Sequence, residues 1–78
     1  MLYRDEKLIG ELNGSHLVVP NYLPRFCINF WEIKKDYRGF GFEDQLMNDA
    51  LRDLIPIYTK QCIVHDLNIN LKTYLDQL

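Results

Sequence analysis

The fold is decided by the stretch from Phe26 to Met47, which reads FCINFWEIKKDYRGFGFEDQLM. Its first eight residues, Phe26–Ile33, are rich in aromatic and β-branched side chains, which predicts a central strand. Residues 34–41 are polar and contain two glycines, which is typical of a loop. From Glu43 onward the apolar side chains recur with a helical period, at Leu46, Met47, Ala50, Leu51 and Leu54. A strand therefore passes through a glycine-containing turn directly into an amphipathic helix.

The chain before this stretch predicts two further strands. Residues 7–12 are short and mostly apolar, and the Asn13-Gly14 pair that follows is the commonest two-residue hairpin signal. Residues 16–19 would then form the partner strand of a hairpin. Residues 20–24 contain two prolines, which cannot donate hydrogen bonds to a sheet, so they predict a bend before the central strand.

The chain after the helix predicts one strand and one more helix. Pro56 predicts that the first helix ends at or just before Ile55. Residues 57–64 are expected to form a strand, with residues 62–64 its most strand-like part. Asn68 or Asn70 would cap a last helix. Its apolar positions are Leu71, Tyr74, Leu75 and Leu78.

The expected order is β-β-β-α-β-α, an α+β fold with a mixed sheet and helices packed on it in an α/β-type three-layer core. The last two strands flank one helix, so they are expected to be parallel neighbours in a βαβ unit. The chain of 78 residues is expected to form a single domain, residues 1–78. Such a short chain has a thin core, which favours pairing with a partner or with a second copy as a homodimer.

Composition excludes several classes of protein. The chain is 47% hydrophobic and 26% charged, which is typical of a globular domain. Its formal net charge of −2 disfavours a nucleic-acid-binding role, which usually requires a strongly basic surface. No apolar stretch approaches the roughly 18 residues of a membrane span, and residues 1–6 do not resemble a secretory signal. We therefore expect a soluble, cytoplasmic protein.

The two cysteines, Cys27 and Cys62, lie within apolar runs. They are expected to be buried free thiols in a reducing compartment, because a disulfide scaffold would contain more cysteines. No spacing of cysteines and histidines indicates a metal site.

The loop at Arg38-Gly39-Phe40-Gly41 has the features of an anion-binding site. Glycines allow backbone N–H groups to point inward, the helix N-terminus carries partial positive charge, and Arg38 adds a cation. A pyrophosphate is the ligand that suits such a loop best. The alternative is an ordinary strand-to-helix turn that uses glycine only for tightness.

This segment resembles the acetyl-CoA-binding segment of the GNAT-type N-acetyltransferases, whose pattern is Arg/Gln-x-x-Gly-x-Gly/Ala between a strand and a helix. Here it reads Arg38-Gly39-Phe40-Gly41-Phe42-Glu43, with Glu43 in place of the family's small residue. Ile33 matches a branched apolar residue five positions before the arginine, and Tyr37 matches an aromatic just before it. The element order over most of the chain also resembles the family's core, without the strands that usually follow it.

The resemblance implies an acetyl-CoA-dependent N-acetyltransferase whose acceptor is a protein lysine or a small amine. Backbone N–H groups at Ile33 would polarise the thioester carbonyl, and Tyr74 would be the catalytic acid that protonates the sulfur of coenzyme A. Tyr74 also lies on the apolar stripe of the last helix, so plain core packing is the alternative reading. The residues that the resemblance assigns to acetyl-CoA binding are Ile33, Arg38, Gly39, Phe40, Gly41, Phe42, Glu43 and Asn68.

A general base is not evident. Strand alternation places Glu32 on the face opposite to Ile33, which favours a solvent-exposed role. His65 and Asp66 are expected to be a polar pair at a strand end, and His16 has no partner nearby in the sequence.

The aromatic residues from Tyr22 to Phe42 exceed what one thin sheet buries. The alternative function is therefore a small, non-catalytic GNAT-like protein, of the kind that phages or mobile elements encode, which docks on a protein partner through an aromatic face.

Overall fold

The computed structural model describes residues 2–4 and 6–77. One mixed sheet has the strand order β1-β2-β3-β4, with β1 at Leu2–Arg4, β2 at Lys7–Leu17, β3 at Arg25–Ile33 and β4 at Ile63–His65. The helices are α1 at Phe42–Tyr58 and α2 at Leu71–Leu75, and single 3₁₀ turns are η1 at Lys35–Tyr37 and η2 at Lys60–Cys62. The α+β class, the mixed sheet and the two helices agree with the prediction. The strand β1 was not predicted, and the strands predicted at residues 7–12 and 16–19 form one strand, β2.

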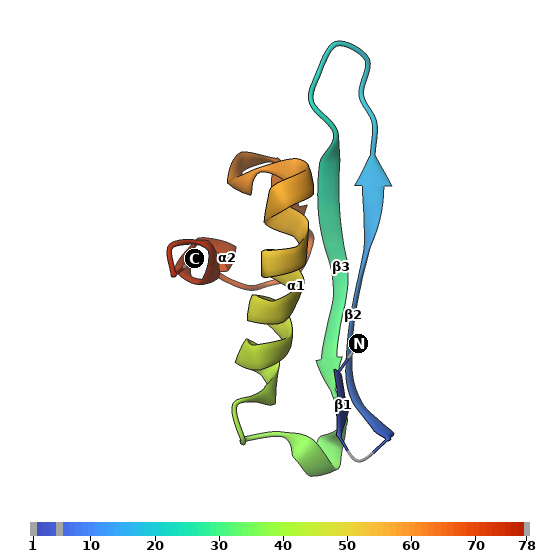
Figure 1. Cartoon of the computed structure of the whole chain (residues 1–78), viewed down its shortest axis with the longest axis vertical. Helices are drawn as coiled ribbons and strands as arrows, with labels where there is room; N and C mark the ends of the chain where they lie inside the picture. The colour runs from blue at the N-terminus through green and yellow to red at the C-terminus, as the bar shows by residue number, and fades with distance from the viewer. Residues whose placement is uncertain (1, 5, 78) are drawn as a thin grey trace.

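Both helices lie on the same side of the sheet (Figure 1). The prediction of a three-layer core is therefore wrong, because the described residues form two layers, one of strands and one of helices. The apolar stripes of α1 and α2 meet the same face of β3 and β4. The central cluster of buried side chains consists of Ile28, Met47, Leu51, Ile63 and Leu71.

The prediction of a hairpin turn at Asn13-Gly14 is wrong. The strand β2 continues through both residues, with Asn13 opposite Phe30 and Gly14 opposite Ile28 in β3. Gly14 does not have the positive φ that a tight hairpin turn requires. A Cβ atom at Gly14 would overlap the ring of Phe26 and the carbonyl oxygen of Cys27. Glycine is needed there because two strands approach closely, and not because the chain turns.

The hairpin turn lies farther along the chain, at residues 18–24. The amide of Tyr22 donates a hydrogen bond to the carbonyl of Val19 at 3.1 Å, so the predicted bend at residues 20–24 is part of this turn. The expected strand at residues 16–19 ends at Leu17. The turn projects beyond the end of α1 (Figure 1).

An extra residue in β3, Asn29, shifts the alternation of its side chains. Phe30 faces Asn13 and Ile28 faces Gly14, so Asn29 has no counterpart of its own in β2. Such a bulge reverses which residues point to each face. As a result Ile28, Trp31 and Ile33 all face the helices, whereas Phe30 and Glu32 face away and are exposed.

The helix α1 does not end before Pro56, as the sequence predicts, but continues to Tyr58. Because Pro56 lies in the last turn, its missing N–H costs one hydrogen bond to the carbonyl of Arg52. The amide of Thr59 still donates to the carbonyl of Ile55 at 3.2 Å and closes the helix. The strand expected at residues 57–64 is correspondingly reduced to β4.

The expected βαβ unit is confirmed. β3 and β4 are parallel neighbours joined through α1, with Phe26 opposite Ile63 and Ile28 opposite His65. Of the two candidate caps, Asn70 immediately precedes α2. Leu78, expected on the apolar stripe of the last helix, lies outside the described residues. Both cysteines are free thiols, with Cys62 buried and Cys27 half-buried.

Candidate functional site

The loop before α1 has the open backbone that an anion site requires. Gly39 and Gly41 have φ values of 86° and 84°, a left-handed conformation that glycine adopts at little cost. A Cβ atom at either position would meet no atom within 4 Å. Gly41 is the N-cap of α1, a helix of 17 residues whose first amides have no acceptor within the helix. The loop therefore presents an unobstructed helix N-terminus.

Arg38 is turned back onto the end of β3. Its Nε donates a hydrogen bond to the carbonyl of Ile33 at 2.8 Å, and its Nη2 is paired with a carboxylate oxygen of Glu32 at 3.1 Å. Both side chains remain about half exposed, at 52% and 56%. Arg38 thus fixes the strand-to-loop junction, and Glu32 offsets part of its charge. As expected, Glu32 is exposed, on the face of the sheet opposite to the helices.

On the side of β3 where β4 lies, the second half of β3 has no neighbouring strand among the described residues. β4 pairs with β3 only as far as Ile28, whose carbonyl accepts a hydrogen bond from the amide of Asp66. The amide of Lys34 donates across to Ile9 in β2 at 2.8 Å. Since backbone groups alternate between the two sides of a strand, the amides of Ile33 and Trp31 point away from β2, toward this open edge.

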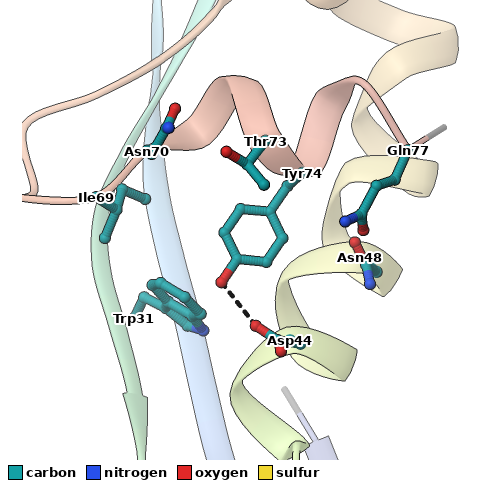
Figure 2. Close-up of a pocket in the computed structure, with 8 residues that line it drawn as sticks. All are labelled: Trp31, Asp44, Asn48, Ile69, Asn70, Thr73, Tyr74 and Gln77. Atoms are coloured by element: carbon teal, nitrogen blue, oxygen red, sulfur yellow. Dashed lines mark hydrogen bonds between the residues drawn. The ribbon is translucent and has the colours of Figure 1, made fainter.

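A cavity of about 530 Å³ lies beside that edge, between β3, α1 and α2. Its wall combines two aromatic rings, one carboxylate, three amide side chains, a hydroxyl and one apolar side chain. The lining residues are Trp31, Asp44, Asn48, Ile69, Asn70, Thr73, Tyr74 and Gln77. Figure 2 shows that Trp31 from β3, Asp44 from α1 and Tyr74 from α2 converge on one end of it.

Tyr74 is the best-positioned proton-bearing group in the cavity. Its hydroxyl donates a hydrogen bond to Oδ1 of Asp44 at 2.7 Å, drawn as the dashed line in Figure 2. Its ring meets that of Trp31 edge to face, at 5.7 Å between centroids. Burial, the hydrogen bond to Asp44 and the negative charges of Asp44 and Glu43 raise the pKa of Tyr74 to about 12.

Glu43, which replaces a small residue of the GNAT pattern, is fixed through its main chain. The indole Nε1 of Trp31 donates to its carbonyl oxygen at 3.2 Å, which ties the first turn of α1 to β3. The half-buried carboxylate of Glu43 lies close enough to Tyr74 to raise the pKa of the phenol. The cavity end of the site is therefore negative, and none of its lining residues is a lysine or an arginine.

The aromatic residues of the loop separate into inward and outward groups. Phe42 contacts the rings of Tyr37 and Phe40, at 6.4 and 6.2 Å between centroids. Phe40 is 72% exposed, whereas Phe42 is half-buried. Of the other exposed aromatics, Tyr22 lies in the hairpin turn at the opposite end of β3, Tyr3 lies on β1, and Phe30 lies on the face of β3 opposite to the helices. The exposed aromatics therefore do not share one face.

Several residues singled out in the sequence lie outside the cavity. Asn68 is exposed, and it is Asn70, one helical turn before Tyr74, that lines the wall. His65 is half-buried at the end of β4, and its Nδ1 is buried without a hydrogen-bond partner among the described residues. His16 is paired through Nδ1 with the hydroxyl of Tyr58, at 2.7 Å.

The sequence analysis did not identify most of the cavity wall. One usable signal was the spacing of Asn70, Thr73, Tyr74 and Gln77, which places these residues on one side of a helical turn. Asp44 and Asn48 have the same four-residue spacing on α1. The two sides face each other across Trp31 because three elements pack together, and no local pattern in the sequence indicates this packing.

Among the described residues, no group of three or more histidines, cysteines and acidic side chains is placed to hold a metal ion. Neither helix within residues 2–4 and 6–77 is long and apolar enough to cross a membrane. No protein-family model, no curated protein and no solved structure matches the chain.

Proposed function

We propose that the chain is a GNAT-like protein that binds acetyl-CoA and transfers its acetyl group to a protein lysine or a small amine. The observation that carries this proposal is the juxtaposition of an open glycine loop at a helix N-terminus with a cavity along an unpaired strand edge. The GNAT resemblance of residues 33–47 names a ligand with the matching parts, a pyrophosphate and an extended arm with two amides.

The loop suits the pyrophosphate. Gly39 and Gly41 leave room for close approach of the backbone, and the N-terminus of α1 favours negative charge. Arg38 retains N–H groups beyond those bound to Ile33 and Glu32, and its side chain is half exposed. The carboxylates of Glu43 and Asp44 oppose an anion on their side of the turn, so the phosphates would lie on the glycine side.

The open edge and the cavity suit the amide-containing arm. The outward amides of Trp31 and Ile33 are donors for a chain that runs alongside β3 as an added strand would. Asn48, Asn70 and Gln77 supply side-chain amides on the opposite wall. The cavity's volume of about 530 Å³ lies within the range of small-molecule sites.

Acetyl-CoA supplies the acyl group as an activated thioester. The amide of Ile33 is the candidate donor to the carbonyl oxygen, on which negative charge develops when the amine attacks. Tyr74 is the candidate hydrogen-bond donor to the leaving sulfur, and for this its hydroxyl would turn from Asp44 to the sulfur. Because its pKa of about 12 lies above that of an ordinary thiol, about 8.5, Tyr74 stabilises the thiolate by hydrogen bonding better than by full proton transfer. The proton that the amine loses on forming the amide then converts the thiolate into the thiol of coenzyme A.

The test is calorimetric titration of the purified chain with acetyl-CoA, repeated with Gly41→Arg. The arginine side chain would occupy the open side of the loop, and its left-handed backbone costs only about 1–2 kcal/mol, so the variant should fold. The matched control is Ile57→Arg, which adds the same side chain at a position that is 72% exposed near the far end of α1.

We expect saturable binding that Gly41→Arg abolishes and Ile57→Arg preserves. Circular dichroism of each variant verifies that the fold is retained. Absence of binding by the folded wild-type chain, or equal binding by Gly41→Arg, would contradict the proposal and favour a non-catalytic docking role.

A further inference from the structure

One edge of the sheet is open over the second half of β2. β1 pairs only with Lys7, Leu8 and Gly10, so residues 11–17 have no neighbour on that side among the described residues. Natural proteins usually protect such an edge with lysine, proline or a covering segment. Between Leu12 and Leu17 this edge has no charged residue and no proline.

The open backbone groups of this edge match those of a second copy. The amide of Lys34 donates to the carbonyl of Ile9, and Glu11 pairs with Glu32, so these residues of β2 direct their backbone N–H and C=O groups toward β3. Because backbone groups alternate between the two sides of a strand, Leu12, Gly14 and His16 direct theirs outward, toward the open edge. These three positions are symmetric about Gly14. An antiparallel copy therefore places Leu12 opposite His16 and Gly14 opposite Gly14, and each facing pair exchanges two hydrogen bonds.

The side chains and the length of the strand agree with the same pairing. Glu11 would face Leu17 and Asn13 would face Ser15, so no like charges meet across the seam. In this register Leu17, the last residue of β2, faces Glu11 of the second copy. The next residue of that copy, Gly10, already pairs with its own β1, so the two β2 strands can pair up to the point where β1 begins. The hairpin turn would then lie against the partner's β1.

Much of the exposed apolar surface lies where this contact would cover it. The turn carries no charged residue from Leu17 to Pro24. Val18, Tyr22 and Leu23 are 68–69% exposed, and on β1 Tyr3 is 58% exposed. Burial of these side chains in a shared interface is favourable in proportion to the apolar area removed from water.

The molecule has more surface than a compact monomer of its size. Its accessible surface is 5595 Å², whereas the relation for folded monomers of 9.3 kDa gives roughly 5000 Å². The excess of about 600 Å² approaches the roughly 800 Å² that each partner buries in a standard stable interface. Its radius of gyration, 13.2 Å, likewise exceeds the value of about 11.5 Å for a compact chain.

We infer that the chain forms a two-fold symmetric dimer in which the β2 edges pair antiparallel about Gly14 and each hairpin turn packs on the partner's β1. The two four-stranded sheets become one continuous sheet with all helices on one side. This inference is independent of the proposed function, because neither the loop at residues 38–43 nor the cavity lies at the β2 edge.

The test is sedimentation equilibrium of the whole chain over a wide range of protein concentrations, with the double variant Val18→Asp/Val19→Asp. Both positions are exposed, at 69% and 44%, so the variant should fold as a monomer. The control, Ile57→Asp, places one such charge at a position that is 72% exposed and lies away from the edge. We expect dimers of the wild type and of the control, and at least a tenfold weaker association of the double variant.

Hydrogen exchange distinguishes edge pairing from any other self-association. In the dimer the amides of Leu12, Gly14 and His16 should exchange more slowly as protein concentration rises, whereas the amides of Asn13 and Ser15, which face β3, should be protected at every concentration. A wild-type chain that stays monomeric, or a dimer in which the three outward amides exchange freely, overturns the inference.

Discussion

Tyr74 is held in its protonated form by its neighbours. Asp44 accepts a hydrogen bond from its hydroxyl at 2.7 Å, and Glu43 adds a second negative charge nearby, so ionisation of the phenol would place three negative charges together. The indole of Trp31 covers one edge of the ring. At neutral pH Tyr74 is therefore a hydrogen-bond donor, and it is excluded as a general base.

Asp44→Asn should lower the pKa of Tyr74 from about 12 toward its ordinary value of 10.0, because it removes a charge while keeping an acceptor oxygen. The measurement is ultraviolet absorbance during alkaline titration, with Tyr74→Phe as the baseline that isolates this tyrosine. Identical Tyr74 titrations in the wild type and in Asp44→Asn would show that the negative charge of Asp44 does not control this group.

The same shift predicts how stability changes with pH. The folded chain binds the Tyr74 proton more tightly than the unfolded chain does, so the stabilisation is complete below pH 10 and is lost as the pH rises toward 12. Urea denaturation should show the wild type losing stability relative to Tyr74→Phe over this interval. Parallel curves for the two proteins would mean that the raised pKa is absent.

At the level of secondary structure, the elements with strong local patterns were predictable. The apolar run of β3 and the helical period that begins near Glu43 follow directly from side-chain spacing, and Gly39 and Gly41 mark the turn between them. The loop half of the candidate site was found for the same reason. A short segment of sequence contains all of its residues.

The elements that could not be predicted depend on contacts distant in sequence. Asn13-Gly14 resembles a hairpin turn, but the close approach of Phe26 makes Gly14 a strand residue. The bulge at Asn29 becomes apparent only from the register of β3 against β2. The cavity half of the site was missed because it requires three elements to converge, and no single one of them indicates it.

The helix α1 continues past Pro56, and the proline lowers the stability of its last turn. Pro56 is exposed, so Pro56→Ala loses little packing and restores an N–H that can donate to the carbonyl of Arg52. The greater freedom of alanine in the unfolded chain offsets part of this gain. We expect the free energy of unfolding to rise by about 1 kcal/mol, measured by urea denaturation.

Pro56→Gly serves as the comparison, because it restores the N–H group but adds backbone freedom and should not stabilise the chain. If Pro56→Ala destabilises the protein, the proline is stabilising the last turn of α1, and its effect on the unfolded chain dominates.

At the scale of the whole molecule, two surfaces with different chemistry are made by different residues. The helix side carries the glycine loop and the polar cavity, whereas the β2 edge from Leu12 to Leu17 is uncharged and the hairpin turn is uncharged and mostly apolar. The molecule extends 44 × 23 × 22 Å, and its long axis follows the β2–β3 hairpin (Figure 1). This separation allows one surface to bind a small molecule while the other binds a second copy.

The most direct test of the central claim is a residue-resolved NMR titration of the whole chain with acetyl-CoA. The account predicts amide shifts at Ile33, Gly39 and Gly41 together with a shift of the Trp31 indole, because these groups surround the proposed pyrophosphate and thioester positions. The amides of the β2 edge should not move. Absence of shifts at the loop and along β3, or shifts confined to the hairpin turn, would contradict the account.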